Sequence, residues 1–144
     1  MRIVARNIEF SYNKGAKFSV AALDGVSLEI TEGEFFGIIG HTGSGKSTFI
    51  QHLNALVPLQ KGELFVGDYD LTPSKKKKDK AKLKDLRKSV GMVFQYPEYQ
   101  LFAETVYEDV AFGIRNFLAE KDEKKVEDLV KSALEKVGLN YAEL

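Results

Sequence analysis

Eight consecutive residues, GHTGSGKS at positions 40–47, constrain the fold of this chain more than any other stretch. An almost continuous apolar run, residues 35–39, precedes them, and such a run is typical of a strand covered on both faces at the centre of an α/β sheet. Apolar residues at helical spacing follow, and Pro58 is expected to stop that helix. They are Phe49, Ile50, Leu53, Leu56 and Val57. Strand, glycine loop and helix therefore occur in the order that a phosphate-binding loop requires.

The residue types in this loop suit the binding of phosphate. Main-chain N–H groups of a loop and a helix N-terminus can point together at a phosphate, and glycine permits the dihedral angles and close approach this needs. Lys46 is expected to reach the β- and γ-phosphates, and the Ser47 hydroxyl to ligate Mg²⁺. The predicted nucleotide-binding residues of the loop are Gly40, His41, Thr42, Gly43, Ser44, Gly45, Lys46, Ser47 and Thr48. The alternative is a plain glycine turn with an exposed lysine and serine.

The remaining elements are predicted from periodicity. Residues 2–12 and 26–30 alternate as two antiparallel strands with one solvated face, and residues 62–66 form a short strand that ends in a turn. Val90, Met92 and Phe94 alternate as a strand that ends at Gln95. Helices are expected over about 105–118 and 126–137, the second ended by Gly138. The predicted fold class is α/β, with a mixed sheet, an antiparallel N-terminal part and no internal domain boundary.

Composition narrows the function classes. Lys plus Arg and Asp plus Glu both number 21, so no global field favours nucleic acid, and the absence of cysteine excludes disulfides and thiolate metal sites. The sequence has no hydrophobic signal-peptide core and no apolar run that could span a bilayer, so we expect a cytoplasmic chain. The basic run at 75–88 is expected to be a solvated face, with contacts to lipid headgroups or nucleic acid as alternatives.

Three segments resemble the nucleotide-binding domain of ABC transporters. NIEFSY at 7–12 is similar to the opening strand of that family, which implies that Tyr12 stacks on adenine. The alternatives are that Tyr12 is simply packed in the strand, or that Phe10 or Phe18 makes the adenine contact. LDGVSLEITEGEFFGIIGHTGSGKST at 23–48 follows the family without a gap. SVGMVFQYPEYQLFAETVYEDVAFG at 89–113 resembles the Q-loop region, which implies that Gln95 positions Mg²⁺ and the nucleophilic water.

Within that family, the phosphate loop and the Q-loop are most similar to the ATPases of energy-coupling factor transporters, which import vitamins or transition-metal ions. His41 and residues 51–53 favour the second of the two paired ATPases. The resemblance implies ATP and Mg²⁺ as cofactors, with Ser47 and Gln95 as metal ligands. It implies a second ABC ATPase subunit in a homo- or heterodimer and an integral membrane subunit as partners, and no nucleic acid. The chain would then be peripheral on the inner face of the cell membrane.

The rest of the hydrolytic machinery of this family is not found in the 144 residues. The signature motif, the Walker B aspartate with its glutamate and the switch histidine are all missing, and residues 64–68 resemble Walker B only superficially because Gly67 interrupts them. We therefore expect a domain that is incomplete at its C-terminal end and that does not hydrolyse ATP unaided. A non-hydrolytic binding module is the alternative. A small nucleotide kinase or GTPase is disfavoured because Asn13 and Lys14 do not begin an NKxD element.

Overall fold

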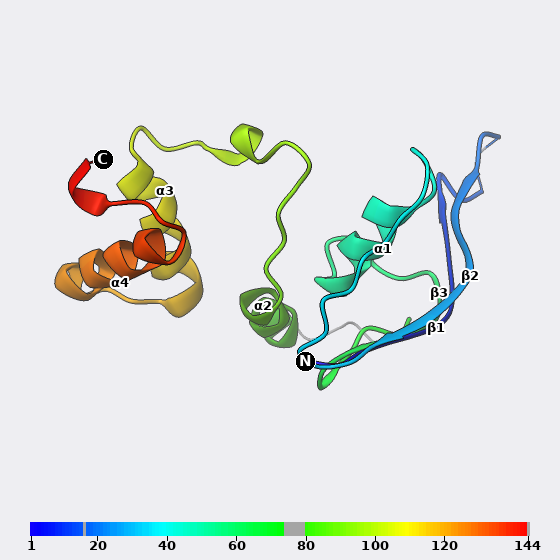
Figure 1. Ribbon diagram of the computed structural model, residues 1–144. Coiled ribbons are helices and arrows are strands. Elements are labelled where there is room, and N and C mark those ends of the chain that lie inside the picture. The colour runs from blue at the N-terminus through cyan, green and yellow to red at the C-terminus, as the bar shows by residue number, and fades with distance from the viewer. Residues whose placement is uncertain (16, 74–79, 144) are drawn as a thin grey trace. The chain divides into compact units, whose positions relative to one another are not determined.

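The computed structural model describes residues 1–15, 17–73 and 80–143, which fall into two units, Met1–Met92 and Val93–Leu144. The first unit contains the sheet, α1 and α2, and the second contains α3 and α4 (Figure 1). Each unit has a hydrophobic core of its own. None of the helices in these described ranges combines the length and the apolar character needed to cross a membrane.

An antiparallel sheet with the strand order β2-β1-β3-β4 forms the first unit. Its strands are β1 (Ile3–Tyr12), β2 (Val20–Ile30), β3 (Lys61–Val66) and β4 (Tyr69–Asp70). The strands predicted over 2–12, 26–30 and 62–66 are thus confirmed, and β2 begins six residues earlier than expected. Gly67 and Asp68 form the turn between β3 and β4, so the segment that resembles Walker B is a strand ending in a turn.

Helix α1 (Lys46–Leu53) and helix α2 (Lys80–Ser89) contribute to the core of this sheet. Phe49 of α1 and Leu86 of α2 belong to the same buried cluster as Ile8 and Leu64. The Arg87 guanidinium of α2 donates to the Ala55 carbonyl just after α1, at 3.0 Å. The last part of the basic run is therefore helical as predicted, while residues 75–79 lie outside the described residues.

Two predicted strands, one of them expected at the centre of the sheet, are not formed. Residues 35–39 and 90–94 have no strand pairing within the described ranges, and Phe35 and Ile39 are 103% and 99% exposed. A parallel central strand exists only where neighbouring strands accept its hydrogen bonds, and the described strands pair only with one another in antiparallel fashion. The predictions of these two strands are therefore wrong for this structure, and its described strands pair in an antiparallel rather than a mixed sheet; the predicted combination of sheet and helices is confirmed.

The second unit is helical, as the sequence predicted. It contains η1 (Pro97–Gln100), α3 (Val106–Gly113), the π-helical η2 (Ile114–Leu118), α4 (Glu123–Lys136) and η3 (Tyr141–Glu143). Gly138, with φ 78°, ends α4 in a Schellman arrangement, because its N–H donates to the Glu135 carbonyl and that of Leu139 to the Leu134 carbonyl. The buried residues of this unit are Ala111, Ile114, Val126, Val130 and Leu134.

Candidate nucleotide-binding site

Two glycines of the loop at 40–47 lie where an added Cβ would meet a close neighbour. Gly45 caps α1 in the left-handed region at φ 86°, and a Cβ at this position would lie 2.2 Å from the Ala22 carbonyl oxygen of β2. A Cβ on Gly40 would lie 2.6 Å from Ser44 Oγ. Gly43 also has a positive φ, 82°. The glycines therefore allow the loop to pack closely on itself and against β2.

The Lys46 ammonium lies inside this bend. Its Nζ donates to the carbonyl oxygens of Gly40 at 2.7 Å and His41 at 2.8 Å, and to Ser44 Oγ at 3.3 Å. These three bonds draw the two ends of the loop together around one cation. The loop is further closed by the Ser44 N–H, which donates to the His41 carbonyl at 3.2 Å. The bend is thus formed and carries a positive charge at its centre.

A cavity of about 230 Å³ opens between this loop and the start of β2. It is lined by Tyr12, Val20, Ala21, Ala22, Gly43, Ser44, Gly45, Lys46, Ser47 and Thr48. The residues present fit a phosphate group: Gly43 and Gly45 give the loop its positive φ angles, Lys46 supplies a cation, and Ser47 is exposed with its hydroxyl available. The N-terminus of α1, which has no side-chain cap, adds main-chain donors.

Tyr12 reaches this cavity from the end of β1. Its hydroxyl shares a hydrogen bond with Thr48 Oγ1 at 3.0 Å, and its ring lies edge-on to Phe10 with centroids 4.9 Å apart. Phe10 is buried in the core of the first unit, and Phe18 is 78% exposed and does not line the cavity. Of the three aromatic candidates for an adenine contact, the fold therefore brings Tyr12 beside the loop.

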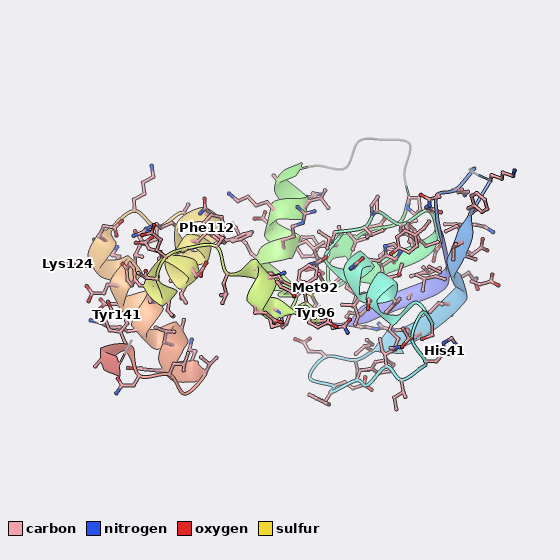
Figure 2. The ribbon with its side chains drawn as sticks, turned by 90° about the horizontal axis from the view of Figure 1, so that it is seen from above. His41, Met92, Tyr96, Phe112, Lys124 and Tyr141 are labelled. Carbon is pink, nitrogen blue, oxygen red and sulfur yellow. The ribbon has the colours of Figure 1, made fainter. Side chains whose placement is uncertain are left out.

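The remaining predicted site residues have simpler surroundings. His41 is exposed on the loop before α1 (Figure 2), with its Nδ1 2.8 Å from the Thr42 carbonyl oxygen. Gln95 belongs to the second unit, is exposed, and donates from Nε2 to the Tyr96 hydroxyl at 3.5 Å. Its role at Mg²⁺ stays a prediction. Across the described ranges no group of three or more His, Cys, Asp or Glu side chains could hold a metal ion by itself.

His52 is a buried polar residue whose importance the sequence did not reveal. It is 1% exposed, its Nδ1 lies 2.7 Å from the Val57 carbonyl oxygen, and its Nε2 has no partner in the described part of the chain. The ring packs edge-on to Phe10 at 4.9 Å. Burial lowers the pKa of His52 below its ordinary value, although the bond to Val57 acts in the opposite direction. The sequence offered one signal of this burial: His52 follows Thr48 by four residues and so lies on the same face of α1.

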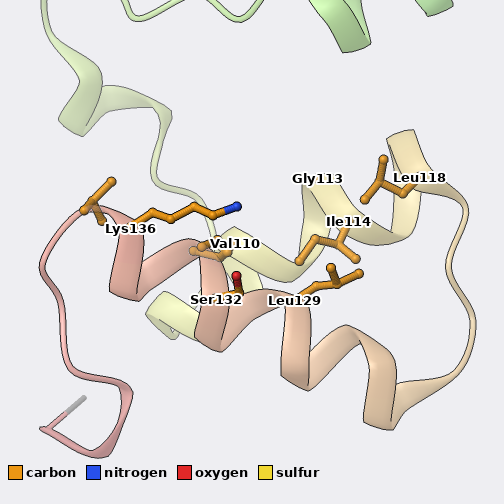
Figure 3. A pocket seen from close by; sticks show the side chains of 9 residues that line it. Val110, Gly113, Ile114, Leu118, Leu129, Ser132 and Lys136 are labelled. Carbon is orange, nitrogen blue, oxygen red and sulfur yellow. The ribbon is translucent and has the colours of Figure 1, made fainter.

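A second hollow lies in the helical unit and contains none of the predicted site residues. It measures about 500 Å³ and runs between α4 and the α3–η2 segment (Figure 3). Its lining is mainly apolar, from side chains such as Val110, Ile114 and Leu129, with Ser132 and Lys136 as polar members. Of the predicted nucleotide-binding residues, all but Gln95 lie in the first unit, at the end of β1, in the loop and at the start of α1.

A family model and several curated relatives match nearly the whole chain. A family model described as ABC transporter matches residues 23–143. The energy-coupling factor transporter ATP-binding protein EcfA2 of Clostridioides difficile is 48% identical over 141 residues, which cover 98% of this chain and 46% of that protein. The EcfA2 protein of Symbiobacterium thermophilum is 51% identical over 142 residues, covering 99% of this chain and 47% of the relative. The chain spans about half the length of these curated relatives.

Solved structures show the same relationship. The structure of cbiO1 from Clostridium perfringens, part of the ABC transporter complex cbiONQ, matches with a TM-score of 0.75 and 30% identity, over 95% of this chain and 50% of that one. A dimeric post-hydrolysis state of the ATP-binding cassette MJ0796, bound to ADP and Pi, matches with a TM-score of 0.80 and 26% identity. The match covers 97% of this chain and 59% of that one. This chain therefore belongs to the ABC transporter family and is similar to about half of an energy-coupling factor ATP-binding protein.

Proposed function

We propose that residues 1–144 are part of the nucleotide-binding domain of an energy-coupling factor importer, and that the loop at 40–47 binds the phosphates of ATP with Mg²⁺. The observation that carries this proposal is the loop itself. Its backbone is packed against the Ala22 carbonyl where only glycine fits, and it is closed around the Lys46 ammonium. A plain glycine turn with an exposed lysine has no need of either contact.

Each residue of the loop has a distinct proposed role. Main-chain N–H groups of Gly43, Gly45 and the first residues of α1 face the phosphates, and Lys46 exchanges its bonds to the loop carbonyls for bonds to phosphate oxygens. The Ser47 hydroxyl ligates Mg²⁺, which when bound neutralises part of the phosphate charge. Phosphate and water oxygens would supply further ligands to the metal. Tyr12 contacts adenine, and Gln95 positions Mg²⁺ and water.

The proposed partners follow from the relatives. Proteins named as energy-coupling factor ATP-binding proteins and the dimeric ATP-binding cassette suggest a second ABC ATPase subunit. The cbiONQ complex suggests a membrane subunit, through which this chain would lie on the cytoplasmic face of the membrane. Residues 101 and 102, exposed beside α3, are the proposed contact with that subunit. Uptake of a vitamin or a metal ion is the process that the whole assembly would couple to ATP.

Calorimetric titration of the 144-residue chain with Mg-ATP tests the phosphate loop. Wild type should release heat on binding, and Lys46→Ala should abolish it, because the loop loses the cation at its centre. Lys84→Ala is the matched control, since Lys84 is an exposed lysine on α2, and it should bind like wild type. GTP and nucleoside monophosphates as competitors separate an ATPase from a GTPase or a small kinase. Folded wild type that gives no heat with Mg-ATP would contradict the proposal.

We further propose that these 144 residues alone bind nucleotide without turning it over. This rests on residues 64–68, which in the structure are the end of β3 and its turn and do not form a Walker B strand followed by a glutamate. Phosphate release from Mg-ATP at steady state should therefore equal the rate without protein. Release that depends on protein and disappears in Lys46→Ala would show that the chain hydrolyses ATP.

A further inference from the structure

One hydrogen bond joins the two sides of the proposed site, Tyr12 at the end of β1 and Thr48 at the start of α1. The hydroxyls of Tyr12 and Thr48 lie 3.0 Å apart, although these residues are 36 positions apart in the sequence. Thr48 is on the first turn of α1, directly after the phosphate loop, and is only 7% exposed. Tyr12 is the last residue of β1 and is 41% exposed at the cavity. The bond therefore ties an exposed aromatic ring to a buried anchor.

The anchor is stiff for two reasons. Threonine is β-branched, so a buried threonine in a helix has few side-chain rotamers. A second contact of the same pair of elements also fixes the orientation of α1, because the buried His52 ring packs on Phe10 with centroids 4.9 Å apart. One helical turn from Thr48 to His52 advances about 6 Å. Two strand residues from Phe10 to Tyr12 advance about 6.8 Å. The two contacts are therefore in register along α1 and β1.

The Tyr12 ring has support from one neighbour and space beside it. Phe10 contacts it edge-on at an interplanar angle of 86°, and Phe10 is in turn packed against His52. The ring is thus held by Phe10 and by its hydroxyl, and it lines the cavity beside the loop. Without the bond to Thr48, the two side-chain torsions of Tyr12 would have to be fixed when the ligand binds, which weakens binding.

We propose that Thr48 is a positioning residue that acts through Tyr12. Its hydroxyl holds the Tyr12 ring at a set distance from the phosphate loop. The ring then contacts the purine base of a nucleotide while the loop binds the phosphates of the same nucleotide. This inference rests on the proposed function, because it needs a nucleotide in the cavity. It assigns the Thr48 side chain to the base end of the ligand, whereas the main chain around it serves the phosphates.

A comparison of two ligands separates these roles. Mg-ATP and Mg-tripolyphosphate are titrated into wild type, Thr48→Val, Tyr12→Phe and the double variant. Thr48→Val and Tyr12→Phe each remove one hydroxyl with little change of shape. Each should weaken Mg-ATP by roughly two- to tenfold, the effect of ordering one side chain on binding, and neither should change tripolyphosphate. The double variant should be no weaker than the single ones, because both remove the same bond.

Two further variants serve as controls. Thr48→Ser keeps the hydroxyl and should restore most of the affinity for Mg-ATP. Tyr99→Phe removes a hydroxyl from an exposed tyrosine of the second unit and should bind both ligands like wild type. Thermal unfolding of each variant accompanies the titrations, and Tyr12→Phe alone tests the bond if Thr48→Val does not fold.

Several results would overturn the inference. Equal weakening of Mg-ATP and tripolyphosphate by Thr48→Val would mean that its hydroxyl acts on phosphate directly. If the loss of Mg-ATP affinity in the double variant equalled the product of the two single losses, the two hydroxyls would act separately. An unchanged affinity of both single variants for Mg-ATP would mean that the bond has no effect on binding. Failure of the proposed function looks different, because wild type would then bind neither ligand.

Discussion

A methyl group at position 45 has no room, because the Ala22 carbonyl oxygen would be 2.2 Å from it. The backbone there is also left-handed, at φ 86°, which alanine adopts only at a cost. We expect Gly45→Ala to lower the free energy of unfolding by about 1–3 kcal/mol and to abolish Mg-ATP binding, measured by denaturant titration and calorimetry. Gly113→Ala is the control, since that glycine is helical and its Cβ would meet nothing within 4 Å. Equal losses in the two variants would contradict this view.

The stability of the first unit should depend on pH through His52. Burial lowers the pKa of His52 in the folded chain, so the unfolded chain takes up a proton first as the pH falls. The contribution is fully present above the unfolded pKa of about 6.5 and is lost as the pH falls towards the lower folded value. The free energy of unfolding should therefore decrease from pH 7.5 to pH 5.5.

Two substitutions separate this effect from other titrations. His52→Leu should remove most of the slope over that interval, whereas His41→Gln, at an exposed histidine, should keep it. Carboxylates with a lowered pKa, such as Glu34 and Glu120, also stabilise the chain less as the pH falls, but in both variants alike. A slope that survives in His52→Leu would assign the pH dependence elsewhere.

At the scale of elements, α4 begins because Asp122 caps it. One carboxylate oxygen accepts from the Lys124 N–H at 3.0 Å and from the Lys125 N–H at 3.4 Å. Asp122→Ala should lower the free energy of unfolding by about 0.5–2 kcal/mol, and Asp122→Asn should retain most of it, in denaturant titrations. Asp128→Ala, at an exposed position within α4, should have a smaller effect. Indistinguishable values for positions 122 and 128 would argue against the cap.

Elements fixed by local chemistry were predicted, and those that need distant partners were not. The apolar stripe and Gly138 predicted α4 and its end, because capping bonds join residues at most five positions apart. The apolar run at 35–39 predicted burial, but burial as a strand depends on neighbours that periodicity does not specify. In the structure, Phe35 and Ile39 are exposed instead.

The same distinction applies to the candidate site. The glycine pattern predicted the loop, because eight adjacent residues contain the cradle, its cation and its hydroxyl. The bond between Tyr12 and Thr48 and the packing of His52 on Phe10 were not predicted, since each joins residues 36 or more positions apart. Only the placement of α1 against β1 reveals them. The family resemblance pointed to Tyr12 but gave no reason for its position.

At the scale of the whole molecule, the exposed segment at 35–39 has consequences for solution behaviour. Phe35 and Ile39 are fully exposed, and contiguous exposed apolar residues favour association. We expect the 144-residue chain to self-associate at micromolar concentration, seen by sedimentation velocity, and the double variant Phe35→Ser, Ile39→Ser to do so less. Phe18→Ser, at an exposed phenylalanine outside this segment, should sediment like wild type. Unchanged association in the double variant would place the contact elsewhere.

The close approach of Gly45 to the Ala22 carbonyl also limits how the gene can change in length. An extra codon between Val20 and Ala22 would put another residue's carbonyl opposite the loop and would shift the pairing of Val20 with Tyr12. Codons gained or lost in the turn between Tyr12 and Val20 leave both alignments intact. Insertions and deletions among homologues are therefore expected at that turn, and the spacing from Val20 to Gly45 should be inherited unchanged.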